Sequence, residues 1–260
     1  MEVFQRWHTG TAGWQLPEEL KSYRRSATQL EQYATYFNAV EINSTFYRPH
    51  LSKTFERWAA TVPNGFRFAV KMHNGVTHVD RLKDIGPVQQ FLDMVGMLGD
   101  RLGPVLVQLP PSLVWSSGSE EFLNALREAY AGDVVLEARH PSWAKADVLR
   151  VLLRARISGV AADPPLIMDE LMPSGYAQLT YFRLHGSPRV YWSSYDDAFL
   201  IRFAAQLMQL LKAGRTVWTI FDNTAAGAAA MDALRLRRIV EGIIEGNVPS
   251  KSGQALGPKR

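Results

Sequence analysis

Short strand-like segments alternate with helix-like segments along the chain, and this alternation constrains the fold more than any other feature. The strand-like segments are residues 6–10, 39–43, 67–72, 105–109, 134–138, 159–162, 178–184 and 216–221. Strands that alternate with helices form parallel sheets covered by helices. Because eight repeats favour a closed barrel over an open sheet, we predict an α/β fold, a single (β/α)8 barrel of the TIM type.

Helical spacing of apolar residues is clear between most of these strands. It occurs in residues 28–37, 88–99, 120–130 and 196–214. The segment after the sixth strand differs, because residues 163–175 contain three prolines and little helical periodicity. Since proline disrupts helix interiors, we expect a loop or a degenerate helix there.

The chain has 260 residues, of which 47% are hydrophobic and 21% charged, as in an ordinary globular protein. We predict one domain over residues 1–246, followed by a polar, flexible tail over 247–260. The absence of cysteine excludes disulfides and thiolate metal sites. No apolar run has the length of a membrane span, so we expect a cytoplasmic protein with no membrane partner. The net charge of +4 is expected to be a solvated surface.

Polar residues recur in pairs, two positions apart, where predicted strands end. The pairs are Glu41 with Asn43, Lys71 with His73, Glu137 with Arg139, and Arg183 with His185; Gln108, Asp163 and Asp222 end other strands. Alternate residues of a strand face the same side. In a TIM barrel, the carboxyl ends of the strands form the catalytic mouth. We therefore predict that these side chains meet in one pocket.

The motifs at these strand ends resemble those of the YecE-like family of proteins of unknown function. They are residues 10–14 (GTAGW), 41–47 (EINSTFY), 71–78 (KMHNGVTH), 108–111 (QLPP), 137–143 (EARHPSW), 181–186 (YFRLHG) and 221–233 (FDNTAAGAAAMDA). The resemblance implies a TIM-type barrel but no established reaction. Met72 and His73 depart from the family pattern, as do Asp222 and Asp232, which stand where the family usually has asparagine.

The predicted pocket combines cations with carboxylates. Lys71, Arg139 and Arg183 could bind an anion, because arginine donates paired hydrogen bonds to phosphate or carboxylate. The alternative is that the arginines only pair with neighbouring carboxylates, and both roles can coexist. As catalytic groups we predict Glu41 or Glu137 as the base, His185 as the proton carrier, and Asp222.

Further rim residues are predicted to contact a substrate. They are Asn43, Tyr47, Gln108, Trp143, Gly186, Asn223 and Thr224. Histidines and carboxylates could also hold a divalent metal, but cations beside the same carboxylates would repel it. We assign no metal ligands and predict no cofactor, and a divalent metal stays an alternative.

These features predict an enzyme acting on an anionic substrate, either a phosphorylated metabolite or a nucleotide or nucleic-acid fragment, by hydrolytic or phosphoester chemistry. One alternative is a non-catalytic protein that binds nucleic acid or a small anion. Another is a metal-dependent isomerase or lyase of the sugar-processing type. The sequence does not assign an oligomeric state.

Overall fold

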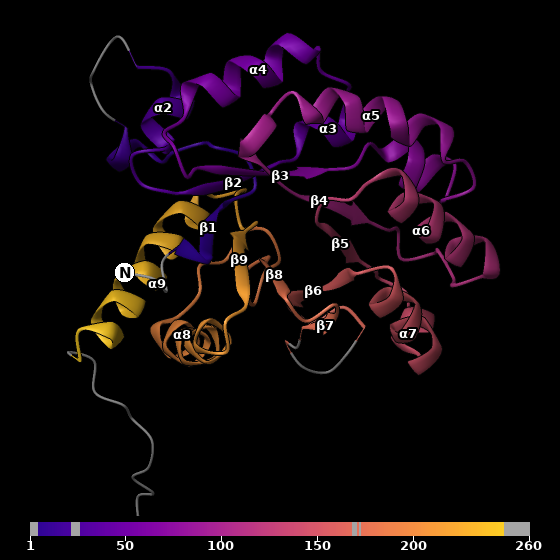
Figure 1. Ribbon diagram of the computed structural model, residues 1–260. Helices are drawn as coiled ribbons and strands as arrows, with labels where there is room; N and C mark the ends of the chain where they lie inside the picture. The colour runs from indigo at the N-terminus through magenta and orange to yellow at the C-terminus, as the bar shows by residue number, and fades with distance from the viewer. Residues whose placement is uncertain (1–4, 22–26, 168–170, 172, 247–260) are drawn as a thin grey trace, which may run out of the picture.

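Eight parallel strands form a nearly closed barrel in the computed structural model, which describes residues 5–21, 27–167, 171 and 173–246 (Figure 1). In chain order they are β1 (Trp7–Thr11), β2 (Ala39–Ile42), β3 (Arg67–Lys71), β4 (Leu102–Gln108), β5 (Val134–Glu137), β6 (Ile157–Asp163), β8 (Leu179–Leu184) and β9 (Thr216–Phe221). From β2 to β9, each of these strands pairs in parallel with the next one in this order, and β1 pairs with β9. A bridge between Ala12 and Glu41 joins β1 to β2. The predicted TIM-type barrel is confirmed.

Helices surround this barrel on the outside, as Figure 1 shows. They are α2 (Gln29–Tyr33), α3 (Ser44–Tyr47), α4 (Ser52–Thr61), α5 (Gly86–Gly96), α6 (Ser117–Ala129), α7 (Ala146–Arg154), α8 (Asp197–Lys212) and α9 (Ala228–Ile244), with short turns η1 (Glu18–Leu20), η2 (Gly75–Val79), η3 (Gly99–Arg101) and η4 (Pro141–Ala144). Within the described residues between β6 and β8 there is no helix. A two-residue strand, β7 (Ser174–Gly175), pairs antiparallel with β6 there instead.

Apolar side chains form two separate groups, one on each face of the barrel wall. The larger group fills the space between strands and helices. The smaller group lies inside the barrel and consists of Ala39, Ala69, Leu106, Val135, Leu179, Tyr181, Trp218 and Ile220. The members from one strand are spaced two apart, as expected for residues that share a strand face. The next inward-facing position on several of these strands is polar, which places polar groups toward the carboxyl ends.

Trp218 fills the barrel interior below those polar groups. Its ring stacks on Tyr181, with ring centroids 5.8 Å apart, and lies 4.7 Å from the ring of His8. On the opposite wall, a Cβ atom at Gly103 would lie 2.5 Å from the indole, so this strand position requires glycine. Burial lowers the pKa of His8 to about 4, so this histidine is a neutral packing residue.

Side chains complete the seam between β1 and β2, where few backbone pairs form. The Tyr33 hydroxyl accepts a hydrogen bond from the Thr11 N–H (2.7 Å) and donates one to the Ala39 carbonyl (3.0 Å). Asn38 bonds the backbone of β1 in the same way, through the Thr9 N–H and the Trp7 carbonyl. These side chains supply hydrogen bonds that the backbone would otherwise lack.

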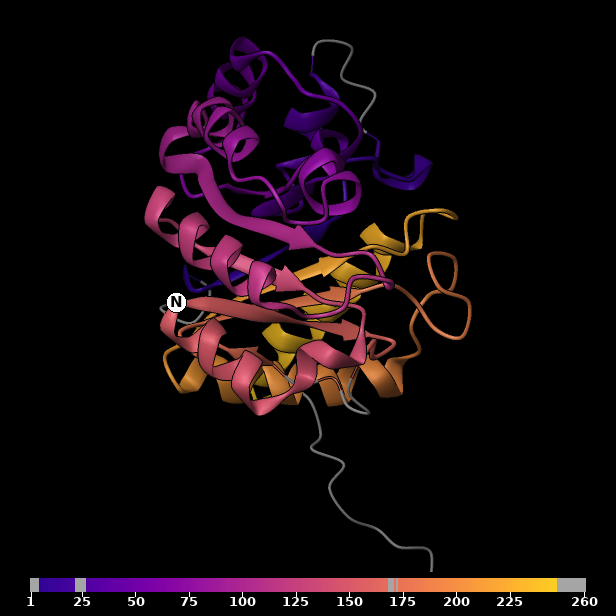
Figure 2. The ribbon, with the colours of Figure 1, turned by 90° about the vertical axis from the view of Figure 1, so that its right-hand side faces the viewer.

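The structure bears on the predicted extent of the domain but not on the predicted tail. The expected tail, 247–260, lies outside the described residues, and those between 5 and 246 belong to the barrel and its covering helices. No helix in the described part of the chain is both long and apolar enough to cross a membrane. Figure 2 shows the barrel from the side, with strand arrows pointing to one end.

Tyr33→Phe is predicted to lower the free energy of unfolding by about 2 kcal/mol or more. The substitution leaves the buried Thr11 N–H and Ala39 carbonyl without a partner, and each such group costs about 1–3 kcal/mol. Urea unfolding monitored by circular dichroism measures the change. Tyr176→Phe is the matched control, because its hydroxyl bonds only the exposed Gln178 side chain. Equal stability of the two variants would contradict a role for Tyr33 in closing the barrel.

Candidate active site

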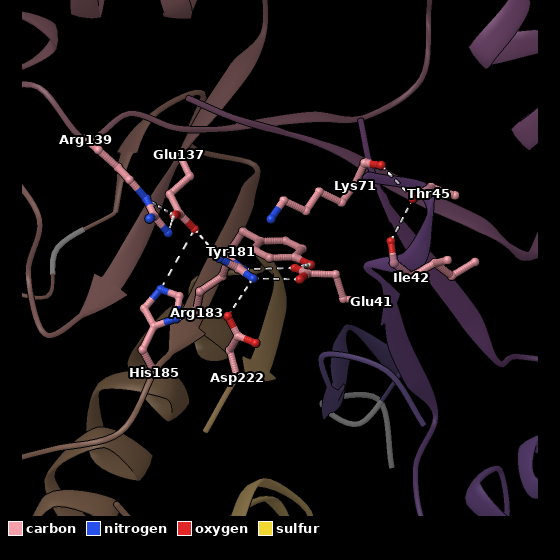
Figure 3. A network of polar contacts seen from close by, with 10 residues as sticks. All are labelled: Glu41, Ile42, Thr45, Lys71, Glu137, Arg139, Tyr181, Arg183, His185 and Asp222. Atoms are coloured by element: carbon pink, nitrogen blue, oxygen red, sulfur yellow. Dashed lines mark hydrogen bonds and ion pairs between the residues drawn. The ribbon is translucent and has the colours of Figure 1, made fainter. Parts of the chain in front are cut away.

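Polar side chains from four separate strand ends meet at the carboxyl end of the barrel (Figure 3). Glu41, Glu137, Arg183 and Asp222 come from β2, β5 and β8 and from the residue after β9, and all are buried. Each follows an inward-facing apolar residue by two positions. The structure therefore brings together the charged residues whose convergence the spacing predicts.

Arg183 is the centre of this cluster and is only 1% exposed. Its guanidinium donates to Glu41 through Nε (3.1 Å) and Nη2 (2.8 Å), to Glu137 through Nη1 (2.6 Å), and to Asp222 through Nη2 (2.9 Å). Three carboxylates on three parts of the chain thus share one cation. We call the group of Arg183, Glu41, Glu137 and Asp222 the floor of the mouth.

The remaining oxygens of the two glutamates are also occupied. The Tyr181 hydroxyl donates to Glu41 Oε2 at 2.8 Å, and Arg139 donates to Glu137 Oε1 through Nε (2.8 Å) and Nη2 (2.6 Å). Tyr181 is a partner that the sequence analysis did not single out, since it lies within an aromatic strand. Every oxygen of Glu41 and Glu137 thus already accepts at least one hydrogen bond.

Electrostatics keep the floor carboxylates ionised. Burial alone would raise the pKa of Glu137, but Arg183, His185 and Arg139 hold it well below its ordinary value. Burial likewise opposes ionisation of Asp222, but Arg183 and the hydrogen bond from His185 lower its pKa. Both groups are therefore fixed negative charges at neutral pH.

His185 lies beside the floor and has one ring nitrogen without a partner. Its Nδ1 is 3.0 Å from Asp222 Oδ2, and since that carboxylate is ionised, we assign the Nδ1 proton to this hydrogen bond. Nε2 is then an acceptor. It is buried, has no hydrogen-bond partner among the described residues, and lies 4.0 Å from Glu137 Oε2. Buried polar atoms are rarely left unpaired, so Nε2 is available to accept a hydrogen bond.

Lys71 points into the cluster from the end of β3, as Figure 3 shows. Its Nζ lies 4.0 Å above the ring of Phe46 and forms neither a hydrogen bond nor an ion pair with the described residues. The residue is 7% exposed. Burial, reinforced by the positive charge of Arg183, lowers the pKa of Lys71 to about 8.

Further cations lie on the same side of the mouth. The pKa of His78 is lowered by burial and by the charges of Lys71, Arg139 and Arg81. The histidine ring packs against Phe46, with centroids 4.9 Å apart. Arg81 was missed by the sequence analysis, because it lies beyond the strand-end motif in a turn with φ of 55°. Its position makes this side of the mouth positive.

Three residues that were predicted to bind substrate use their hydrogen-bond donors within the protein. Trp143 is buried, donates to the Leu113 carbonyl at 2.8 Å and packs against Trp115. The Gly186 N–H donates to the Tyr195 hydroxyl (2.8 Å), and Asn223 Nδ2 donates to the Ser193 carbonyl (2.9 Å) and to Asp232 (2.8 Å). These contacts leave the donors with no free position for a ligand.

The other predicted substrate-binding residues lie around the rim. Tyr47 is 74% exposed, and Gln108 is buried at the end of β4. Asn43 and Thr224 line a cavity of about 620 Å³, which also includes Gln15 and Gly227. The residues that line this cavity do not include those of the floor. The Asn43 amide oxygen is buried and has no partner among the described residues.

A metal site finds no support in this arrangement. Within the described part of the chain, no three histidine or carboxylate side chains are grouped so that they could hold a metal ion. The floor carboxylates instead bind the Arg183 guanidinium, which occupies the position where a cation would be held.

Lys71→Met is predicted to raise the free energy of unfolding at pH 7 by on the order of 3 kcal/mol. The pKa of Lys71 is about 8 in the folded protein and 10.5 ordinarily, so the unfolded chain holds this proton more tightly. The free-energy cost of burying the ammonium therefore has its largest value below pH 8. It falls as the pH rises from 8 and disappears above 10.5. Urea unfolding should show a smaller difference in the free energy of unfolding between the variant and the wild-type protein at pH 10 than at pH 7.

Lys53→Met is the matched control for that measurement, because Lys53 is exposed on α4. It should change stability by less than about 0.5 kcal/mol at either pH. A Lys71→Met protein that is less stable than wild type at pH 7 would contradict the free-energy cost that we assign to burying the Lys71 ammonium.

Comparison with known proteins places the chain in a family. Residues 8–253 match the model of "Protein of unknown function DUF72". The UPF0759 protein YecE of Escherichia coli K12 is 31% identical over 143 residues, which is 52% of this chain and 49% of the relative. The matched region thus spans about half the length of that relative. The UPF0759 protein YunF of Bacillus subtilis is 24% identical over 250 residues, covering 83% of this chain and 88% of the relative.

Solved structures agree with the fold. A DUF72 family protein from Thermotoga maritima has a TM-score of 0.74 and 26% identity, covering 90% of this chain and 99% of its own. A DUF72 family protein from Enterococcus faecalis has a TM-score of 0.75 and 18% identity, covering 98% and 99%. With the family model spanning most of its length, the chain belongs to the DUF72 family, the family of YecE and YunF, whose members have no assigned function.

Proposed function

We propose that this protein is an enzyme that binds a small anionic metabolite at the carboxyl end of the barrel and transfers a proton on it through His185. The observation that carries the proposal is the buried, unpartnered Nε2 of His185, whose opposite nitrogen is held by Asp222. An imidazole fixed by a carboxylate in this way presents one nitrogen in a defined direction, which is what general acid–base catalysis requires.

The cations beside this imidazole support an anionic substrate. Arg139 uses Nε and Nη2 on Glu137, and its side chain keeps 19% exposure, so it can donate outward while paired. Lys71 has no ion pair among the described residues, and Arg81 adds charge from the rim. A carboxylate or phosphate placed here would gain charge-assisted hydrogen bonds.

The geometry changes the roles that the sequence suggested for other residues. Arg183 is buried and bonds three carboxylates, so it supports the site rather than holding the anion. Glu41 and Glu137 bind arginine and tyrosine donors, so His185 is the better candidate for the base. Lys71 and Arg139 are the cations that we assign to substrate binding.

The burial of the floor residues favours a small metabolite over a nucleic acid. The floor residues are buried, and the exposed surface nearest to them belongs to Arg139, to Asp222 (12% of its side chain) and to Lys71. A duplex or extended strand would need a broad basic surface. Nucleic-acid binding and metal-dependent isomerisation are therefore not the functions that we propose.

Arg139→Gln is predicted to weaken the binding of inorganic phosphate about tenfold or more, because a charge-assisted hydrogen bond contributes about 1.5–3 kcal/mol. Isothermal titration calorimetry at low ionic strength measures the affinity. Arg150→Gln is the matched control, since Arg150 is exposed on α7 and its loss should leave binding unchanged. Equal phosphate affinities of the wild-type protein and both variants would contradict an anion site at Arg139.

His185→Asn is predicted to abolish turnover while phosphate binding stays within about threefold of wild type. The asparagine amide can still donate to Asp222, but no group replaces Nε2, and general acid–base groups contribute about 10²–10⁴-fold to rate. Wild-type protein is first screened by proton NMR against phosphorylated sugars and oxo acids, and the variant is tested on each compound converted. Turnover retained by His185→Asn would rule out this histidine as the proton carrier.

A further inference from the structure

Unlike Arg139 and Arg183, Lys71 has no anionic partner among the described residues. Arg183 and Arg139 both hold carboxylates at 2.6 Å. Lys71 Nζ contacts the face of Phe46 and points toward the floor, and no carboxylate lies within ion-pair distance of it in the described part of the chain. A cation–π contact compensates burial only in part.

The surroundings of Lys71 favour its neutral, nucleophilic form. Burial and the neighbouring Arg183 lower its pKa to about 8, so roughly a tenth of the molecules carry a neutral amine at pH 7. Lysines that attack carbonyl groups are activated in these two ways, by desolvation and by a neighbouring cation. Both causes are present at this position.

We propose that Lys71 is a nucleophile that forms an imine with a small carbonyl compound bearing a carboxylate or phosphate. This inference rests on the function proposed above and specifies its substrate class. The carbonyl carbon would sit at Lys71 Nζ, and the anionic group would face Arg139 and Arg81. Lys71 keeps a small exposed fraction, 7%, on the side from which such a compound would have to approach.

The step requires no co-reactant. The Nζ lone pair attacks the carbonyl carbon, a C–N bond forms, and the carbonyl oxygen takes a proton. The nitrogen then loses a proton, the hydroxyl leaves as water after a further protonation, and a C=N bond forms. Amine, carbonyl compound and one proton thus give an iminium ion and water, with no change of oxidation state. His185, which lies beside the floor, is available to move these protons through Nε2.

The floor also suits the product of this step. The charges of Glu41, Glu137 and Asp222 act on Lys71 and favour its positive form. An iminium formed at Nζ carries the same positive charge as the lysine ammonium, so these carboxylates stabilise it as well. An iminium withdraws electrons from the adjacent carbon, so the site fits reactions that break a bond at that carbon.

The test is reductive trapping. Wild-type protein is incubated with glyoxylate, or with glycolaldehyde phosphate, and sodium cyanoborohydride, and the modified peptides are quantified by mass spectrometry. Lys71 should carry at least about ten times the adduct of Lys53 or Lys145, both exposed on the surface. Its labelling should rise with pH with a midpoint near 8, whereas that of the exposed lysines should rise only toward 10.5.

Lys71→Arg cannot form an imine, so the adduct at position 71 should vanish, while the labelling of Lys53 and Lys145 stays as in the wild-type protein. The comparison of Lys71 with Lys53 and Lys145 is internal to the wild-type protein and does not depend on the variant folding. Labelling in proportion to exposure, with Lys71 unmodified and phosphate still bound, overturns the imine and leaves the proposed function intact. Selective trapping of Lys71 without phosphate binding supports the nucleophile and overturns the anion site.

Discussion

The structure of the barrel mouth depends on one interaction, the binding of three carboxylates by the guanidinium of Arg183. Glu41, Glu137 and Asp222 would repel one another in a buried space, and burying any of them alone would cost several kcal/mol. The planar fork of Arg183 reaches all three at distances of 2.6 to 3.1 Å. No lysine could do this, since an ammonium lacks the width and the five donors of a guanidinium.

The position of this guanidinium follows from the packing beneath it. Tyr181 stacks on Trp218 inside the barrel, and its hydroxyl reaches upward to Glu41. Small residues such as Ala39 and Ala69 leave room for these two rings. The aromatic layer therefore fixes the height of Glu41, and Glu41 in turn orients Arg183. His185 and Lys71 pack instead against residues that follow strands, Tyr191 after β8 and Phe46 after β2.

Much of this could be predicted from local patterns in the sequence. The spacing of Glu137 and Arg139, and of Arg183 and His185, follows from the alternation of strand faces, which is a local property. Which cation pairs with which carboxylate depends on distances between β2, β5, β8 and β9, and no local pattern contains them. Thus the sequence did not distinguish the saturated Arg183 from the unpaired Lys71.

Residues outside the strand ends were harder to assign. Trp143 lies in a strand-end motif, but the turn at η4 directs its indole toward Leu113 and the core. Arg81 contributes charge from a turn that has no strand-like pattern. The helices α4, α7 and α9 were not singled out either, although α7 is strongly amphipathic in the structure, with Val148, Val151 and Leu152 buried on one side.

Arginine and lysine differ in this site because the charge of Arg183 is permanent, whereas Lys71 can lose its proton. Arginine at 183 stays charged at every physiological pH, so the three carboxylates always have their counterion. A second arginine at position 71 would add permanent repulsion against it, whereas lysine can release its proton and become an amine. The neighbour that stabilises the carboxylates thus adds to the effect of burial in lowering the pKa of Lys71. In the reaction that we propose, the buried charge of Arg183 supports the structure and also favours the neutral amine.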